Sequence, residues 1–374
     1  MASPHVIVVG AGIGGLSVAW ALARRGARVE VVDQGPIPNP LSSSHDEHRI
    51  IRHAYGFLSG YGRLAGAAYA AWETLWADIG RRHFVETGSI FTFRGDDGWA
   101  QASIAVMAET GAVIRPLPLS VLAGKAPMLT TDGLVAAYET EGDGLLFCRR
   151  ILADLVVHLA RLGARFHPRT RVLDVDPEAC TVTTDAGVLK GDAVVAAAGA
   201  WTPRLLPAFA ADLTPSRQAV MYLAPPASLA AAWDRAPVIV DFNGEAGTYT
   251  IPPRAGTRLK VGDHVFTRAG DPDGDRVATA DDVARLRAAA AGAFAGFQDY
   301  TVLEEKICFY TVREDETFLA VPIGRAGYVL SACSGHGFKF GPLIGGFVAE
   351  AVFGERSGAD LTAVVGGDAN LLVV

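Results

Sequence analysis

The stretch that decides the fold is His5-Val-Ile-Val-Val-Gly-Ala-Gly-Ile-Gly-Gly15, near the start of the chain. Its uncharged residues 6–9 run directly into glycine, which predicts a buried strand that ends in a tight turn. The next segment, 14–25, has the character of a helix, and a glycine just past its end supplies a stop signal. A second apolar run, 28–32, ends at Asp33. Together these segments predict a parallel strand–helix–strand unit.

The glycines of this unit have the spacing of a phosphate-binding turn, Gly10-x-Gly12-x-x-Gly15. Gly10 permits a sharp turn, Gly12 lets the backbone approach a pyrophosphate, and Gly15 lets the helix pack on the strand. Asp33 ends the second strand, where a carboxylate can accept hydrogen bonds from ribose hydroxyls. The motif predicts a dinucleotide whose pyrophosphate lies at the positive end of the helix. By itself it does not distinguish NAD from FAD.

The composition is that of a globular chain with a large core. Of its 374 residues 50% are hydrophobic and 20% charged, and the formal net charge is −7. This length favours two domains. Without a basic tract, nucleic acid and anionic membranes are not expected as partners. The uncharged run 6–23 contains too many glycines to be a good membrane span, so we expect no membrane association.

The number and spacing of the cysteines indicate whether disulfides or a cysteine metal site are expected. Four cysteines lie far apart and form no CxxC pair, so neither a structural metal site nor a disulfide framework is expected. A reducing cytoplasm fits this pattern. The cysteines are Cys148, Cys180, Cys308 and Cys333.

A second glycine-rich loop near the far end of the chain favours FAD over NAD. Ser334-Gly-His-Gly-Phe-Lys-Phe-Gly341 leads into Pro342, a favoured first residue of a helix. The loop therefore ends at another helix start, which is suited to the negative charge that a reduced flavin carries on its N1–C2=O edge.

The remaining segments predict two interleaved domains. Helices are expected at 62–79, 149–162 and 282–295, and strands at 85–93, 165–174, 180–190, 194–198, 217–224, 237–242, 247–252, 258–262, 301–311 and 327–333. The pattern predicts an α/β plus α+β fold, in which a Rossmann-type FAD-binding domain is interleaved with a strand-rich substrate domain. We expect the first domain to comprise 1–84, 145–215 and 312–374, and the second 85–144 and 216–311.

Four motifs in this order resemble one family, the monomeric sarcosine oxidase and N-methyltryptophan oxidase group of the D-amino-acid-oxidase-like flavoproteins. His45 with Arg49-Ile-Ile-Arg-His-Ala-Tyr-Gly56 is similar to its N-terminal signature. Leu259-Lys-Val-Gly-x-His264 is similar to its oxygen-site strand, and Cys308-Phe-Tyr-Thr311 to its flavin-attachment segment. Residues 334–340 are similar to its C-terminal flavin loop. The resemblance extends over nearly the whole chain and implies a monomer.

The resemblance implies a carboxylate-binding pair. Arg52 would bind a substrate carboxylate through two parallel hydrogen bonds, and Lys339 would be the second anchor. Tyr55 lies in the same signature and is assigned to the substrate site. Other interpretations remain open, because Arg49 and Arg52 could pair with nearby acids such as Asp46 and Glu47. Lys339 could also extend to water.

The resemblance also implies groups around the flavin. Lys260 would face the flavin and stabilise negative charge as oxygen is reduced. The alternation of residues along a strand also allows Lys260 to point outward to solvent. Cys308 would form a thioether to the flavin, although a lone cysteine is commonly a core residue. Arg49, His45, His264, Tyr249 and Tyr310 are the remaining residues assigned to the flavin or the pocket; His264 could be structural, and the tyrosines could be core aromatics. Gly335 and Gly337 belong to the flavin loop.

Four departures from the family pattern affect the expected substrate. His48 replaces a small residue, Phe57 and Leu58 replace a polar loop, and Val240 replaces a longer side chain. These argue against sarcosine itself and favour a larger or cyclic substrate. We expect an oxidase of a secondary-amine amino acid that has a free carboxylate, with an imine and hydrogen peroxide as products. Two alternatives are a flavin dehydrogenase that uses another electron acceptor and an NAD-dependent dehydrogenase.

Overall fold

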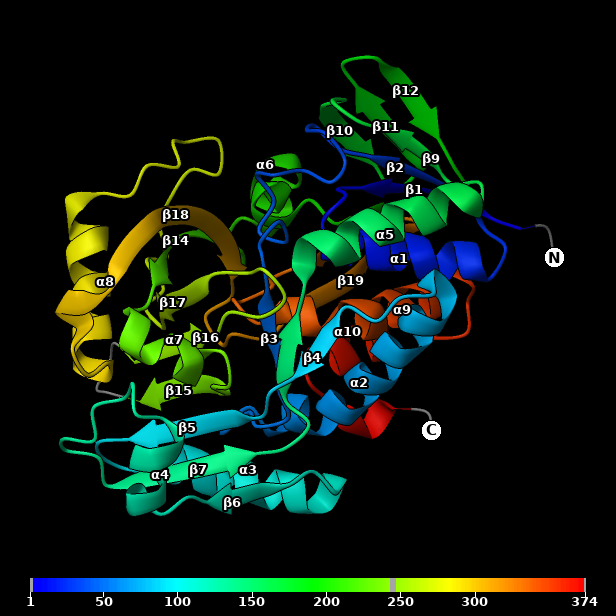
Figure 1. The fold of residues 1–374 in the computed structure, drawn as a ribbon. Helices are drawn as coiled ribbons and strands as arrows, with labels where there is room; N and C mark the ends of the chain where they lie inside the picture. Colours follow the sequence, from blue (N-terminus) through cyan, green and yellow to red (C-terminus); the bar gives the residue numbers. More distant parts are fainter. Residues whose placement is uncertain (1–2, 243–246, 373–374) are drawn as a thin grey trace.

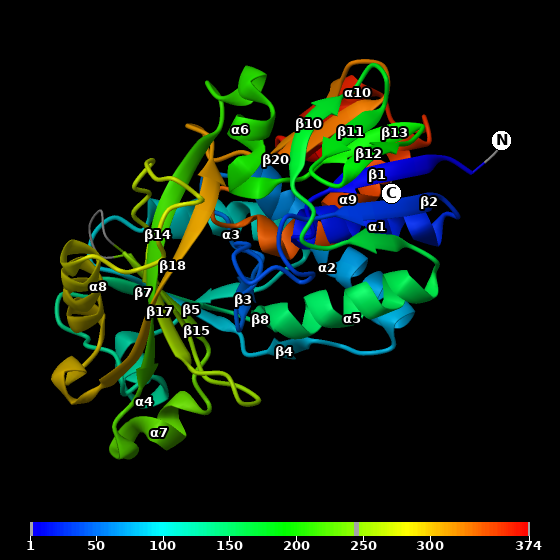
Figure 2. The ribbon, with the colours of Figure 1, turned by 90° about the horizontal axis from the view of Figure 1, so that it is seen from above.

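The computed structural model describes residues 3–242 and 247–372, which form two large sheets with helices between and around them (Figures 1 and 2). The first sheet has six strands and includes both strands of the predicted unit at the start of the chain. All neighbouring pairs are parallel except the pair at one edge, β19 with β20. In spatial order the strands are β19 (Leu319–Ile323), β20 (Gly327–Ser331), β13 (Ala193–Ala196), β1 (His5–Val9), β2 (Arg28–Val32) and β9 (Arg165–His167).

Alternate residues of β1 face different layers, as side chains of a strand must. Val6 and Val8 belong to a core shared with helices, whereas Ile7 and Val9 pack toward a small antiparallel sheet on the other face. This explains why β1 is apolar throughout. The helices of that core are α1 (Ile13–Arg24), α2 (Ser59–Ile79), α5 (Cys148–Arg161), α9 (Gly341–Val352) and α10 (Gly358–Val365). The small sheet comprises β10 (Val172–Asp176), β11 (Thr181–Thr184) and β12 (Gly187–Lys190).

Helices α1 and α9 come from opposite ends of the chain and pack closely against each other. A Cβ atom on Gly345 would lie 2.5 Å from the carbonyl carbon of Ser17, and one on Gly341 would lie 2.6 Å from the Ile13 side chain. These glycines therefore allow a backbone approach that side chains would prevent.

The second large sheet has eight strands and is antiparallel except where β15 pairs with β5. Helices α4, α7 and α8 contribute to the core on one of its faces. In spatial order the strands are β18 (Thr301–Val312), β14 (Thr214–Ala224), β17 (Leu259–Asp263), β16 (Thr248–Ile251), β15 (Val238–Phe242), β5 (Ser89–Phe93), β7 (Ala136–Thr140) and β6 (Ile114–Pro116). The remaining helices are α3 (Gly98–Thr110), α4 (Leu119–Lys125), α6 (Thr202–Leu205), α7 (Ala227–Trp233) and α8 (Ala280–Ala293), with short 3₁₀ turns at Gly199–Trp201, Pro207–Phe209, Phe297–Asp299, Gly337–Phe340 and Ala369–Leu371.

A three-stranded sheet, β3-β8-β4, corrects one predicted element. The sequence predicts a single strand at 85–93, but the structure has β4 (Phe84–Glu86) in this sheet and β5 in the eight-stranded sheet. Gly88 separates them, because its φ of +67° interrupts an extended backbone. The other strands of this sheet are β3 (Arg49–Ile51) and β8 (Gly144–Leu146).

The predicted fold class is confirmed, including the Rossmann-type arrangement around β1, α1 and β2. Helix α2 begins three residues earlier than predicted, and α3, α4, α6, α7, α10, β3, β6, β7, β8 and β19 were not predicted. The six-stranded sheet draws on all three ranges expected for the FAD-binding domain, and the eight-stranded sheet on both ranges expected for the substrate domain. The domain boundaries themselves stay a prediction.

Candidate active site

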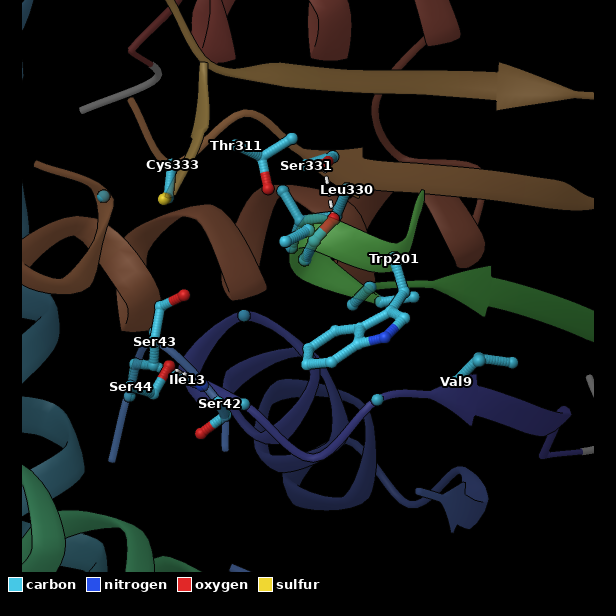
Figure 3. Close-up of a pocket in the computed structure, with 18 of the residues that line it drawn as sticks. Val9, Ile13, Ser42, Ser43, Ser44, Trp201, Thr311, Leu330, Ser331 and Cys333 are labelled. Atoms are coloured by element: carbon cyan, nitrogen blue, oxygen red, sulfur yellow. Dashed lines mark hydrogen bonds between the residues drawn. The ribbon is translucent and has the colours of Figure 1, made fainter. Parts of the chain in front are cut away.

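The first cavity lies at the carboxyl ends of the parallel strands, where the fold class places its ligands. We call it the glycine cavity. Its lining includes Val9, Gly10, Gly12, Ile13, Val32, Asp33, Ser42, Ser43, Ser44, Ala197, Ala198, Trp201, Thr311, Leu330, Ser331, Cys333, Gly337 and Gly341. Figure 3 shows the three serines and Ile13 on one side of it and Thr311, Ser331 and Cys333 on the other, with the indole of Trp201 nearby.

Two glycines of the predicted motif are required by the turn itself. Gly10 has a φ of +101°, and a Cβ atom there would lie 2.4 Å from the carbonyl oxygen of Ala197. A Cβ atom on Gly15 would lie 1.9 Å from the carbonyl oxygen of Gly10. Gly15 therefore packs directly against the backbone of the turn and does not line the cavity, whereas Gly10 and Gly12 form part of its wall. The backbone thus forms a cradle that a side chain would fill.

The polar groups of the glycine cavity suit a dinucleotide. Helix α1 has no acidic residue in its first turn, and Ile13 N donates to Ser44 Oγ at 2.9 Å, so its positive end meets hydroxyl groups. The Asp33 carboxylate accepts from Ala11 N at 2.9 Å and from Gly35 N at 2.8 Å. Burial raises the pKa of Asp33, against the lowering effect of these donors. The cradle, the helix end and the carboxylate fit a pyrophosphate and a ribose.

The second cavity, of about 540 Å³, lies beside the eight-stranded sheet, and we call it the arginine cavity. The structure brings most of the predicted substrate and flavin residues together here. Those lining it are Arg49, Arg52, Tyr55, Tyr249, His264, Tyr310, Gly335 and Lys339. Phe57, Leu58 and Val240, three of the departures from the family pattern, also line it. Lining residues that sequence reasoning missed include Ile50, Trp99, Phe242, Phe266, Glu314, Asp315, Glu316 and His336.

Two cations on this wall have no acidic partner. Among the described residues, the Arg52 guanidinium makes no hydrogen bond or ion pair, and it lies 5.3 Å from the ring centroid of Trp99 and 5.5 Å from that of Tyr55. The Lys339 ammonium is buried and donates to Tyr55 Oη at 3.0 Å and to the His336 carbonyl at 3.2 Å. Burial lowers the pKa of both groups, and the charge of Arg52 further lowers the pKa of Lys339. A cation pair of this kind can bind an anion.

The two histidines of the arginine cavity are neutral at neutral pH. Burial, and then the charge of Arg52, lowers the pKa of His264 to about 4. Burial, and then the charge of Lys339, lowers the pKa of His336 to about 3. His336 Nε2 lies 3.0 Å from the Glu316 carbonyl, so a neutral ring donates there and leaves Nδ1 as an acceptor facing Tyr55 Oη at 3.5 Å. Tyr55 can thus accept from Lys339 and donate to His336.

A second group of cations shares one buried carboxylate behind this wall. Lys260 is 0% exposed, and its Nζ donates to Asp46 Oδ2 at 2.5 Å. The same carboxylate pairs with Arg49 at 3.2 Å and Lys306 at 3.8 Å, and it accepts a hydrogen bond from Tyr222. We call Asp46, Lys260, Arg49, Lys306 and Tyr222 the inner cluster. Lys260 itself is not among the residues that line either cavity.

The interpretation that Arg49 and Arg52 pair with nearby acids is therefore half right. Arg49 contacts Asp46, as well as the hydroxyl of Tyr310 at 3.3 Å, but Arg52 does not pair with either neighbouring acid. Glu47 instead pairs with Arg258 at 2.7 Å. The sequence signal for Asp46 was only its position three residues before Arg49 in a polar loop, which gave no indication that it is buried.

Three other predicted residues lie away from the cavity walls. His45 and Cys308 line neither cavity. Cys308 lies on β18, where it packs with Tyr310 and Cys333. His48 is fully buried under the loop, and its Nε2 lies 3.0 Å from the Arg258 carbonyl. His48 therefore forms no part of either cavity wall.

Comparison with known proteins agrees with this geometry. The family described as "FAD dependent oxidoreductase" matches residues 5–351. The chain is 26% identical to a monomeric sarcosine oxidase of Bacillus sp. (strain B-0618), over 96% of this chain and 94% of that protein. It is 25% identical to an N-methyl-L-tryptophan oxidase of Salmonella dublin, over 96% of each chain.

The fold recurs in solved structures. The crystal structure of L-proline dehydrogenase from P. horikoshii superposes with a TM-score of 0.83 at 20% identity, covering 97% of each chain. Within the described part of the chain, no helix is both long enough and apolar enough to cross a membrane.

Proposed function

Because this chain belongs to the family of FAD dependent oxidoreductases, we propose that it oxidises a secondary-amine amino acid, either N-methylated or cyclic, to an imine and passes the electrons to oxygen. The glycine cavity would hold FAD through the Gly10–Gly12 turn, the α1 end and Asp33. FAD held there would supply the redox chemistry, as the acceptor of a hydride equivalent from the carbon next to the amine. Hydrogen peroxide would be the second product. The family membership confirms the resemblance and argues against the NAD alternative.

One observation carries the proposal: Arg52 and Lys339, from opposite ends of the chain, meet on one cavity wall without an acidic partner among the described residues. A substrate carboxylate would complete the pair, since Arg offers two parallel donors and Lys339 a point charge. Trp99 and Tyr55 hold the guanidinium by ring contacts where an acid would otherwise do so. The substrate would then be fixed at its carboxylate, with its amine directed toward the flavin.

The volume and walls of the arginine cavity support a substrate larger than sarcosine. Trp99 and Phe242 contact each other with ring centroids 4.8 Å apart, and Val240 lies on the same wall. Such apolar surfaces favour a ring or a hydrocarbon substituent over water. A neutral His264 on this wall adds no charge that would repel a substrate amine.

A paired substrate panel tests the proposal. Oxygen uptake and peroxide formation would be measured with sarcosine, other N-methyl amino acids, proline, pipecolate and glycine, and with each matching amine that lacks the carboxylate. We expect turnover of at least one secondary-amine acid and poor turnover of its matching amine. Equal turnover of acid and amine would contradict carboxylate binding.

A dehydrogenase remains the second candidate, because Lys260 contacts Asp46 and does not line a cavity. Repeating the panel with an artificial dye acceptor under nitrogen decides between the two. An oxidase consumes oxygen at a rate comparable to dye reduction, whereas a dehydrogenase reduces only the dye. Either result leaves the amino-acid substrate class to be judged by the paired panel.

We further propose that Cys308 attaches the flavin covalently, on the basis of the family resemblance. Acid precipitation of the holoenzyme should leave yellow colour in the pellet, and Cys308→Ser should release it. Cys333→Ser is the matched control, because Cys333 lines the glycine cavity and burial raises the pKa of its thiol, which disfavours the reactive thiolate. Release of colour from the unchanged protein would contradict the attachment.

A monomer acting in the cytoplasm completes the proposal. Light scattering coupled to size-exclusion chromatography tests the monomer. Limited proteolysis would test whether the proposed domain ranges behave as separate units.

A further inference from the structure

Lysine is rare in this chain, and three of its five lysines lie on the wall of the arginine cavity or in the inner cluster. The 33 Lys and Arg residues include five lysines: Lys125, Lys190, Lys260, Lys306 and Lys339. Lys339 lines the arginine cavity, and Lys260 and Lys306 both meet the Asp46 carboxylate. Unlike Arg, a buried Lys readily loses its proton, so its charge depends on what surrounds it.

Asp46 lies in a loop, yet its carboxylate is buried and accepts hydrogen bonds from three donors. Its carboxylate receives Lys260 Nζ at 2.5 Å, the Tyr222 hydroxyl and Glu47 N at 2.8 Å. An ammonium with no exposure, such as that of Lys260, is costly to bury unless an anion and hydrogen bonds compensate for lost water. In the described residues, Asp46 is the carboxylate that makes this contact.

Apart from Glu47, whose carboxylate pairs with Arg258 at 2.7 Å, the neutral histidine, tyrosines and buried Cys148 thiol around Lys260 do not supply negative charge. Burial raises the pKa of the Cys148 thiol and the Tyr310 hydroxyl to about 12, and it raises the pKa of Tyr222 and of Tyr249 well above the ordinary value of a tyrosine. Burial lowers the pKa of His48 to about 4, so it is neutral at neutral pH. The titratable and charged groups around Lys260, which lies on β17, are Arg49 on β3, Tyr222 on β14, Tyr249 on β16, Lys306, Cys308 and Tyr310 on β18, Cys148 on α5, and His45, Asp46, Glu47 and His48 on the loop before β3.

We propose that Asp46 is a positioning residue, whose carboxylate fixes the Lys260 side chain and keeps it a charged ammonium inside the protein. This inference rests on the proposed oxidase function, and on the role in the reaction with oxygen that the family resemblance implies for Lys260. Burial and the nearby Arg49 charge lower the pKa of Lys260, and Asp46 opposes them. Without Asp46, Lys260 would face Arg49 and Lys306 as a third unpaired cation and would lose its proton at lower pH.

Selective lysine labelling observes this charge directly and without turnover. Holoenzyme labelled with ¹³C at lysine Cε should give resonances from only five side chains, and Lys260→Met identifies the one of interest. In the unchanged protein, Lys260 should keep the chemical shift of an ammonium at about pH 8. A neutral amine there overturns the proposal, even if variants of Asp46 fail to fold.

Asp46→Asn is the decisive variant, because it keeps the size of the side chain and removes its charge. The Lys260 resonance should titrate at lower pH, and reoxidation of the reduced enzyme by oxygen should slow about tenfold or more at alkaline pH while recovering near pH 6. Tyr222→Phe is the matched control, since it removes a neutral donor from the same carboxylate and should leave the Lys260 titration in place. An unchanged titration in Asp46→Asn, or faster reoxidation, overturns the inference.

These outcomes separate the inference from the proposed function. If Lys260→Met reoxidises as fast as the unchanged protein, the role of Lys260 in oxygen chemistry is wrong. The NMR titration of Asp46→Asn still decides whether Asp46 holds the charge of Lys260.

Discussion

The inner cluster and the wall of the arginine cavity each bring cations together, but among the described residues only the cations of the inner cluster form an ion pair with a shared carboxylate. Lys260, Arg49 and Lys306 share the Asp46 carboxylate. Among the described residues, Arg52 and Lys339 form no ion pair; Tyr55, Trp99 and a carbonyl contact them, and the Asp143 carboxylate raises the pKa of both without pairing with either. Burial lowers the pKa of Lys339 well below its ordinary value, because removal from water disfavours its charged form.

This difference indicates two uses of positive charge. A cation that already has an anion partner is a fixed part of the protein's electrostatic field. A pair that lacks one gains most when a ligand supplies it, because binding removes an existing penalty. Under the proposed function, the inner cluster would act on the reaction with oxygen, and the cavity wall would bind the substrate carboxylate.

The largest expected effect comes from removing the charge of the inner cluster. Lys260→Met should slow reoxidation of the reduced enzyme by oxygen by about a hundredfold to a thousandfold, because a buried charge near developing negative charge contributes several kcal/mol. Reduction by substrate under nitrogen should change far less. Stopped-flow absorbance measures both half-reactions. Equal losses in both would indicate that Lys260 supports the fold or the substrate.

Removing a cation from the cavity wall should have the next largest effect. Arg52→Ala or Lys339→Ala should lower kcat/KM by about tenfold to a hundredfold, since each supplies a charge-assisted hydrogen bond of roughly 1.5–3 kcal/mol. Arg52→Lys should recover only part of the loss, because an ammonium cannot donate two parallel hydrogen bonds to one carboxylate. Steady-state kinetics and competitive inhibition by simple carboxylates measure this, and unchanged inhibitor affinity would contradict the assignment.

The lowered pKa of Lys339 predicts an alkaline loss of activity. A base with a lowered pKa loses its proton as the pH rises through that lowered value, and the neutral amine binds a carboxylate poorly. We expect kcat/KM to fall on the alkaline side and kcat to fall less, because the bound carboxylate favours the charged form. Lys339→Arg remains charged and should move the fall to higher pH. The same profile in both proteins would show that another group titrates.

The smallest effect should come from Lys306, the partly exposed lysine of the inner cluster. Lys306 is 27% exposed and lies 3.8 Å from Asp46, so water screens its charge. Lys306→Met should change reoxidation less than about threefold and the free energy of unfolding by less than about 1 kcal/mol. It is the matched control for Lys260→Met, and a comparable loss in both variants would remove the distinction between them.

Local sequence patterns predicted the cofactor side of the molecule well. The turn at Gly10 and Gly15 and the carboxylate of Asp33 lie within a single strand–helix–strand unit, so their spacing determines their geometry. The same patterns failed at 85–93, where an apolar alternation concealed a change of sheet at Gly88. Periodicity reports which residues are apolar, but it does not report which strands they pair with.

The arginine cavity and the inner cluster depend on contacts between distant segments. Arg52 and Lys339 were united in the prediction by family resemblance, since nothing in their local sequences relates them. Asp46 lies in a polar loop that is typical of the surface, and its burial arises only when β14, β17 and β18 close around it. Trp99 lies on a helix that sequence patterns did not predict, and its role against Arg52 is visible only in three dimensions.

The packing of α1 against α9 also has a consequence for biosynthesis. Residues 13–24 leave the ribosome more than three hundred positions before residues 341–352, against which they pack. During that interval the glycine turn lacks the helix that covers it, and the apolar face of α1 is exposed to chaperones or to other nascent chains. Contacts with so large a sequence separation also form slowly. Cofactor loading is therefore expected to follow completion of synthesis, so that flavin supply and the rate of late folding together set the yield of active enzyme.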